Sequence, residues 1–295
     1  MSKIKIITDS GSDITVEKAE KLGIRMIPIM FTFDGENYYK EGVDMSVEEF
    51  YEKLSLSDTP IPKTTQITPV RYADVFNEEY DNGYDTLIVV TISSKGSGMY
   101  QNAIISAQDV MDERGGEIIV VDSHGFSCVY GGGVVHAAHM LSEGKSKDEI
   151  VSYLEDVYST MHSYFIVSDL SYLKKGGRIN TASLVIANML DIKPVLSIID
   201  GLVVQNGKLR GNKRLFKKLV EKVKEDGYDL TGKTVFGVHT LQKEKFGEVR
   251  EALEGAFESV KTVDLVLGSI IGCHGGPDLV GFVFSDKYSF DDYED

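Results

Sequence analysis

Short apolar segments rich in β-branched residues alternate with segments of helical periodicity through the first half of the chain. Three of these segments, residues 4–7, Thr86–Thr91 and 117–121, consist largely of Ile, Val and Leu. Such near-continuous apolar runs are typical of parallel strands that are buried on both faces. Each run is followed by a polar or glycine-bearing loop and then by a helical pattern. This alternation predicts an α/β fold in which helices flank a parallel sheet.

Capping patterns mark where several expected helices begin. Two capping boxes, each a serine followed three residues later by a glutamate, precede apolar runs of helical spacing: Ser46 with Glu49, and Ser146 with Glu149. Thr68 followed by Pro69 predicts an N-cap and a first helical residue, with the helix continuing to about residue 80. Apolar residues recur at helical spacing from Tyr100 to Met111, so a further helix is expected there.

The pattern changes after residue 180. The apolar runs 194–199 and 202–204 are separated by Asp200-Gly201, a preferred sequence for a two-residue hairpin turn. Because hairpins join antiparallel strands, the second half is expected to contain a mixed sheet. The other elements expected there are a basic helix at 212–224, a strand at Thr234–His239, a helix near 244–257 and a strand at 261–267.

These two patterns predict two domains with a boundary near residue 160. Residues 1–160 form an N-terminal α/β domain with the parallel sheet, and residues 161–295 form a smaller C-terminal α/β domain with the mixed sheet. A ligand is expected between them, since pockets commonly form at domain interfaces. The acidic end of the chain, residues 291–295, is expected to be frayed.

Charge and composition exclude several classes of partner. A net charge of −15 would repel the phosphates of nucleic acid and the anionic surface of a membrane. No apolar run approaches the roughly 20 residues that span a bilayer, so stable membrane insertion is not expected. The N-terminus lacks the apolar stretch of a signal peptide, and Cys128 and Cys273 provide no disulfide framework. We therefore expect a cytoplasmic protein.

Two adjacent glycines stand out in the segment Leu-Ser-Tyr-Leu-Lys-Lys-Gly-Gly-Arg-Ile-Asn at residues 170–180. Glycine loses the most backbone entropy on ordering, so Gly176 and Gly177 are unfavourable inside a helix or strand. One interpretation is a helix C-terminus with lysines in its last turn. The other is a tight turn that brings the backbone close to another group while Arg178 projects forward.

Hydroxyl groups cluster where an expected strand ends and a helix begins. Ser93, Ser94 and Ser97 occupy this loop, and open α/β sheets bind ligands at the carboxyl ends of their strands. Thr64 provides another hydroxyl before a helix, and His274 is expected in a glycine-rich loop. Together these groups could surround a carboxylate. Alternatively, the serines only cap the helix and fill the turn.

Other motifs do not predict catalytic or cofactor chemistry. Residues 96–98 lack the Gly-x-Ser-x-Gly order of a nucleophile elbow, and Gln101 replaces the third glycine of a dinucleotide loop. Four residues with metal-binding side chains are interpreted as part of a core helix and its approach: His124, Cys128, His136 and His139. Asp9 and Asp13 are interpreted as stabilising their own loop through side-chain-to-backbone bonds. No metal and no cofactor are expected.

The segment 170–180 resembles the L-x-Y-L-x-x-G-G-R-I block of the DegV family, bacterial proteins that bind long-chain fatty acids. Four further segments agree with family blocks in order and spacing. They are Thr-Asp-Ser-Gly-Ser-Asp at 8–13, Lys-Thr-Thr-Gln-Ile-Thr-Pro at 63–69, Ile-Ser-Ser-Lys-Gly-Ser-Gly-Met-Tyr-Gln-Asn-Ala at 92–103 and His-Gly-Gly-Pro at 274–277. The resemblance covers nearly the whole chain.

The resemblance implies a lipid-binding protein rather than an enzyme. The family's threonine and serine that hold the fatty acid carboxylate correspond to Thr64 and Ser94, and Ser93 and His274 are expected nearby. Some family members serve as the binding subunit of a fatty acid kinase, whose separate ATP-binding subunit phosphorylates the bound carboxylate. Arg178 is then expected to contact that partner or the phosphoryl group.

Two other functions are left open. A stand-alone acyl hydrolase or transferase would use Ser94 and His274, and a sugar or dihydroxyacetone-type ligand is suggested by fold analogy alone. The chain also departs from the family blocks at Thr65, Ile67, Gly96, Met99 and Asp278. We expect Gly96 and Met99 to alter the width of the pocket, and Asp278 to bring a carboxylate close to His274.

Overall fold

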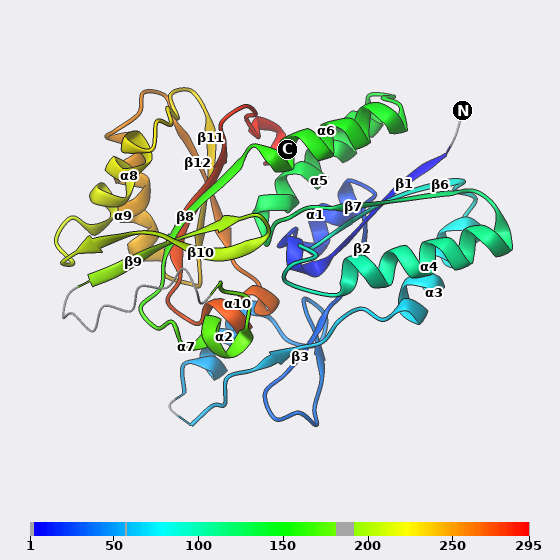
Figure 1. The fold of residues 1–295 in the computed structure, drawn as a ribbon, viewed down its shortest axis with the longest axis horizontal. Coiled ribbons are helices and arrows are strands. Elements are labelled where there is room, and N and C mark those ends of the chain that lie inside the picture. Colours follow the sequence, from blue (N-terminus) through cyan, green and yellow to red (C-terminus); the bar gives the residue numbers. More distant parts are fainter. Residues whose placement is uncertain (1–2, 57, 181–191, 295) are drawn as a thin grey trace.

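The computed structural model describes residues 3–56, 58–180 and 192–294, and these form an α/β fold with a parallel and a mixed sheet (Figure 1). The parallel sheet has the strand order β2-β1-β6-β7. Its strands are β1 (Ile4–Asp9), β2 (Arg25–Ile27), β6 (Thr86–Thr91) and β7 (Glu117–Asp122). All six residues of β6 are buried, as its continuous apolar sequence predicts.

Helices cover both faces of the parallel sheet, with α3 and α4 on one side and α5 and α6 on the other (Figure 1). The helices of this half are α1 (Val16–Lys21), α2 (Val47–Leu54), α3 (Pro69–Asp81), α4 (Met99–Arg114), α5 (Cys128–Ser142) and α6 (Lys147–Ser159). Both predicted capping boxes form, and Thr68 caps α3 with Pro69 in its first turn. No helix in the described part of the chain is long and apolar enough to cross a membrane.

The mixed sheet has the strand order β10-β9-β8-β13-β11-β12. Its strands are β8 (Met161–Ile166), β9 (Ile192–Ile199), β10 (Leu202–Arg210), β11 (Thr234–His239), β12 (Lys261–Val266) and β13 (Val280–Ser285). The predicted hairpin joins β9 and β10, and Asp200 and Gly201 at its turn have φ angles of 48° and 76°. These left-handed angles explain the Asp-Gly sequence.

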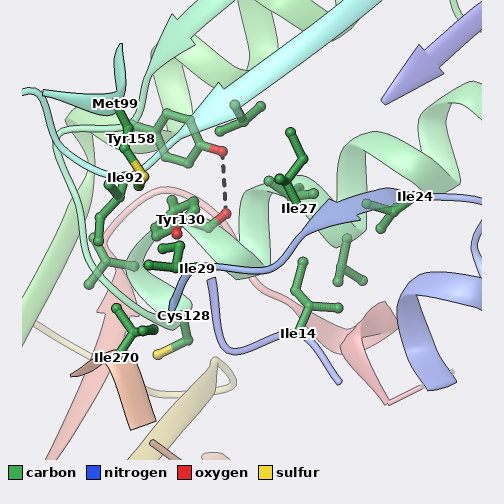
Figure 2. Close-up of a cluster of buried hydrophobic side chains, with 14 of the residues drawn as sticks. Ile14, Ile24, Ile27, Ile29, Ile92, Met99, Cys128, Tyr130, Tyr158 and Ile270 are labelled. Atoms are coloured by element: carbon green, nitrogen blue, oxygen red, sulfur yellow. Dashed lines mark hydrogen bonds between the residues drawn. The ribbon is translucent and has the colours of Figure 1, made fainter. Parts of the chain in front are cut away.

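A separate apolar cluster covers one face of the mixed sheet, where α8 (Leu215–Glu225) and α9 (Lys243–Glu254) pack. The opposite face joins the core that extends into the parallel sheet and its helices. In Figure 2, Ile29, Ile92 and Ile270 gather around Tyr130 and Cys128 of α5. The last strand of the parallel sheet ends at Asp122, and the first strand of the mixed sheet begins at Met161. The division into domains 1–160 and 161–295 stays a prediction.

A short helix of the second half packs against a small antiparallel sheet of the first. The small sheet consists of β3 (Met30–Thr32), β4 (Tyr39–Lys40) and β5 (Lys63–Thr64). The helix α10 (Ser269–Gly275) contacts β3, β5 and α2, and it also packs on α7 (Ser171–Gly176). A C-terminal helix is therefore built into N-terminal structure.

The end of the chain is docked on the protein, so the prediction of a frayed end was wrong for residues 291–293. These residues form a 3-10 turn, η3 (Asp291–Tyr293), and Tyr293 is buried against Phe236 with ring centroids 4.8 Å apart. Asp292 also pairs with His136 of α5 at 2.6 Å. Burial of the aromatic ring outweighs the tendency of an acidic end to remain in solvent.

Candidate functional site

A cavity of about 170 Å³ lies between the mixed sheet and loops of the N-terminal half. Most of the side chains that line it are aliphatic or aromatic. They include Ile92 from the end of β6, Phe165 of β8 and Ile270 of α10, so both halves of the chain contribute to the wall. An apolar cavity of this kind suits a hydrocarbon ligand.

Polar side chains that also line this cavity come from distant parts of the sequence. Thr64 of β5, Arg178 after α7 and His274 of α10 are among them, together with Ser97 of the loop before α4. Oγ1 of Thr64 lies 3.0 Å from Nε2 of His274. The structure therefore brings together three of the residues that the sequence predicted, Thr64, His274 and Arg178. Hereafter we call these three residues and Ser97 the polar end of the cavity.

The imidazole of His274 is neutral at pH 7. Burial lowers its pKa to about 4, and the positive charge of Arg178 adds to this effect. A neutral imidazole has one donor and one acceptor nitrogen. Since Nε2 faces Thr64, it can fix the direction of the threonine hydroxyl. The other ring nitrogen, Nδ1, is buried without a hydrogen-bond partner in the described residues.

Glycine is needed at positions 176 and 177 for different structural reasons. Gly177 has a φ angle of 70°, and its N–H donates to the carbonyl of Leu173 at 3.0 Å, so it ends α7 in the left-handed conformation. Gly176 instead allows a close approach, because a Cβ atom there would lie 2.3 Å from Nδ1 of His274. The interpretation as a helix C-terminus is therefore confirmed, and the expected close approach occurs at Gly176 within the helix rather than in a separate turn.

Arg178 is half-buried and lines the cavity, so its guanidinium faces the interior, although the sequence predicted that it projects toward a partner or a phosphoryl group. Its Nε donates to the carbonyl of Gly96 at 2.8 Å, and Nη1 donates to the carbonyl of Gly176. Burial lowers its pKa. In residues 3–56, 58–180 and 192–294 the guanidinium forms no ion pair. A partly desolvated cation without a counter-ion favours an anionic ligand.

The structure does not bring the side chains of Ser93 and Ser94 to the cavity. Ser93 is fully buried, and its Oγ donates to the carbonyl of Gly201 at 2.8 Å. Ser94 is exposed, and its N–H donates to Asp122. The reason is a turn in which the N–H groups of Gly96 and Ser97 both bond to the carbonyl of Ser93, so Ser94 faces outward and Ser97 faces the cavity.

This arrangement bears on the hydrolase alternative. An acyl hydrolase needs its serine within hydrogen-bond reach of the base. The exposed Ser94 is not beside His274, whose Nε2 is paired with Thr64 instead. The Ser94–His274 mechanism is therefore not favoured. Sequence spacing could not single out Ser97 over Ser94, because three serines within five residues fit the same loop.

Two departures from the family blocks shape the site, and a third does not act as expected. At Gly96 a Cβ atom would lie 2.4 Å from the ring of Phe126, so this ring occupies the space of the missing side chain. Met99 is buried and lines the cavity. Asp278 accepts from the N–H of Ser168 at 3.2 Å, and the lowered pKa of His274 arises from burial and from Arg178.

Metal binding finds no support at the histidines. In the described ranges of the chain, no three His, Cys, Asp or Glu side chains are grouped as ligands for a metal ion. His136 pairs with Asp292, and Cys128 is fully buried at the start of α5.

The whole chain resembles known proteins of one family. The family described as "Uncharacterised protein, DegV family" matches residues 3–287. The chain belongs to the DegV family. A DegV domain-containing protein of Caldanaerobacter subterraneus is 36% identical over 287 residues, which cover 97% of this chain and 100% of the relative. The resemblance expected from the five sequence blocks is thus confirmed.

Solved structures of DegV proteins share the fold. A DegV family protein from Thermus thermophilus, described for its fatty acid binding, is 27% identical with a TM-score of 0.84 over 96% of this chain and 99% of its own. A stearic acid-binding protein from Eubacterium ventriosum is 28% identical with a TM-score of 0.80, over 97% and 99% of the two chains. The predicted fold class, a parallel sheet flanked by helices plus a mixed sheet, is confirmed.

Proposed function

We propose that this DegV protein binds a long-chain fatty acid between its two predicted domains, with the acyl chain in the apolar cavity and the carboxylate at the polar end. The observation that carries the proposal is the guanidinium of Arg178, which forms no ion pair within the described residues and lies beside the Thr64–His274 pair at one end of a cavity with apolar walls. The fatty-acid-binding DegV proteins from Thermus thermophilus and Eubacterium ventriosum support it.

The tail and the head group have different roles in this proposal. Each CH₂ removed from water contributes about 0.8 kcal/mol, so a sixteen-carbon tail dominates the affinity. A hydrogen bond to a charged group contributes about 1.5–3 kcal/mol, and a few of these fix the orientation of the carboxylate. In this arrangement Nε2 of His274 donates to Oγ1 of Thr64, Thr64 and Ser97 donate to the carboxylate, and Arg178 balances its charge.

We further propose that the protein is a non-catalytic binding subunit in the cytoplasm, which presents the carboxylate to a separate ATP-dependent kinase subunit. Two features support this role. The sequence carries no nucleotide-binding motif, so ATP would be supplied by the partner. Arg178 stands at the polar end, where a planar guanidinium can bind the phosphoryl group of an acyl phosphate as well as a carboxylate.

Denaturing extraction of the purified protein followed by lipid mass spectrometry tests the ligand class. We expect a long-chain fatty acid in the extract, and affinity that falls in Thr64→Ala and Ser97→Ala without being abolished. Ser94→Ala is the matched control, because its exposed side chain does not line the cavity. Wild-type affinity in a Thr64→Ala, Ser97→Ala double variant would refute the site, and turnover of a chromogenic acyl ester would favour the hydrolase instead.

A further inference from the structure

Three carboxylic acids lie in the interior on the N-terminal side of α10. Asp9 and Glu41 are buried, and Asp13 retains some exposure although its Oδ2 atom is enclosed. Asp9 is bonded within its own half, since its carboxylate accepts from Tyr130 and from the N–H groups of Gly11 and Ile92. The other two acids reach across to the C-terminal half.

Asp13 and Glu41 cap the start of α10 from a distance. The helix begins after Gly268, which has no side chain to cap it. Instead, Oδ1 of Asp13 accepts from the N–H of Gly268 at 3.0 Å, and Oε1 of Glu41 accepts from the N–H of Ile270 at 2.8 Å. A Cβ atom at Gly268 would lie 2.7 and 2.5 Å from these two oxygens, so both carboxyl groups converge on one backbone position.

The same short helix carries His274. It has seven residues, so movement at its first turn is transmitted to its last. Ile270 and His274 are four residues apart, on one face of the helix, and both line the cavity. At the other end, the imidazole is confined by the backbone of Gly176. The direction of the imidazole toward Thr64 thus depends on where the first turn of α10 is anchored.

We propose that Asp13 and Glu41 are positioning residues, which hold the first turn of α10 so that His274 faces Thr64 and the bound carboxylate. The inference rests on the proposed fatty acid site. It assigns a role in the site to an acid that the sequence suggested only as a local loop contact, Asp13, and to Glu41, which no sequence motif marked. Neither residue touches the cavity itself.

The hydrogen bonds from Gly268 and Ile270 to these two acids, which we call the anchor of α10, are also sensitive to pH. Burial raises the pKa of Asp13 and that of Glu41, and repulsion between neighbouring carboxylates raises both further. Oδ2 of Asp13 and Oε2 of Glu41 have no hydrogen-bond partner in the described residues, so a proton can reside there. The titratable groups of the described chain that face them are Asp9, Tyr51, Cys128, Tyr130, Cys273 and Tyr293.

None of these groups supplies a positive charge, so a second ionisation is unfavourable in the folded state. The folded pKa values are raised above the ordinary carboxyl value near 4. The native state therefore binds more protons than the unfolded state, and the stability of the anchor is lost as pH rises through the folded values. The affinity of the protein for a fatty acid carboxylate should therefore also fall as pH rises into the alkaline range.

The test compares palmitate with 1-hexadecanol, which has the same tail without the carboxylate, on delipidated protein. We expect Glu41→Ala to weaken palmitate binding about ten- to a hundredfold and hexadecanol binding far less. Glu41→Gln, which keeps an acceptor for Ile270, should retain the affinity at pH 7 and show a smaller alkaline decline, since only Asp13 still titrates. Glu79→Ala is the matched control, since Glu79 of α3 is also buried but contacts Arg25 of β2 and Asn82 at the end of α3.

Several outcomes would overturn the inference. An equal loss for both ligands in Glu41→Ala, or the same selective loss in Glu79→Ala, would show that burial alone matters. If Glu41→Ala does not fold, a Glu41→Gln protein with the wild-type pH profile contradicts the proposal. Failure of the wild-type protein to bind palmitate would instead refute the proposed function, so the two failures are distinguishable.

Discussion

Alanine at Gly176 should weaken fatty acid binding with little effect on stability, whereas alanine at Gly177 should lower stability with little effect on binding. Gly176 lies in the last turn of α7, where alanine is favoured over glycine by up to about 1 kcal/mol. The added Cβ would lie 2.3 Å from Nδ1 of His274, however, and ordinary contact begins at 3.4 Å. The imidazole must therefore move by about 1 Å, which takes Nε2 beyond hydrogen-bond range of Thr64.

Loss of this bond leaves the Thr64 hydroxyl without its orienting partner. We expect Gly176→Ala to weaken fatty acid binding about tenfold or more, with a change in the free energy of unfolding of about 1 kcal/mol or less. Gly177→Ala is the internal control. Its φ angle of 70° costs an alanine about 1–2 kcal/mol of stability, but a Cβ there meets no atom within 4 Å.

The assay pairs urea denaturation with titration of a fluorescent fatty acid for both variants. The reasoning predicts a crossed result, in which Gly176→Ala loses affinity and Gly177→Ala loses stability. Wild-type affinity in Gly176→Ala would refute it, because the imidazole would then have no required position. Equal losses of affinity in both variants would show that the turn as a whole, not the close approach, determines binding.

Three further predictions concern other parts of the molecule. Arg178→Ala should reduce partner-dependent acyl phosphate formation more than fatty acid affinity, and equal losses measured side by side would contradict a role toward the phosphoryl group. Because burial lowers the pKa of His274 to about 4, the unfolded state binds the extra proton first as pH falls below about 6.5. The contribution of His274 to the free energy of unfolding should then fall by up to about 3 kcal/mol between pH 6.5 and 4, and the difference between the pH profiles of the wild type and a His274→Asn variant measures it. Tyr293→Ala should lower the free energy of unfolding by about 3–5 kcal/mol in chemical denaturation, and a change below 1 kcal/mol would mean that the C-terminal turn is dispensable.

Local chemistry explains which elements could be predicted from the sequence. The capping boxes at Ser46 and Ser146 and the Asp200-Gly201 turn depend on neighbouring residues alone, and each forms as expected. The helix α10 was interpreted instead as a glycine-rich loop. Its seven residues include Gly272 and Gly275, which disfavour a helix, and its cap comes from Asp13 and Glu41.

The candidate site also contains residues that local sequence could predict and residues whose position depends on the folded backbone. Thr64, His274 and Arg178 could be predicted because the family blocks mark them, and the structure places them together. Ser94 could not be distinguished from Ser97, because the direction of each serine depends on a backbone turn that many sequences can adopt. The end of the chain was misjudged for a related reason, since the burial of Tyr293 depends on Phe236, which lies far away in the sequence.

The pairing of Thr64 with His274 has a consequence for how the protein is made. The two residues are 210 positions apart, and the anchor between Asp13 and Gly268 spans 255. During synthesis the N-terminal layers can fold as soon as they leave the ribosome. The polar end cannot close until α10 has emerged, long after Thr64 and Ser97 have left the ribosome. A nascent chain that still lacks α10 therefore cannot complete the proposed binding site, which forms in a single late step.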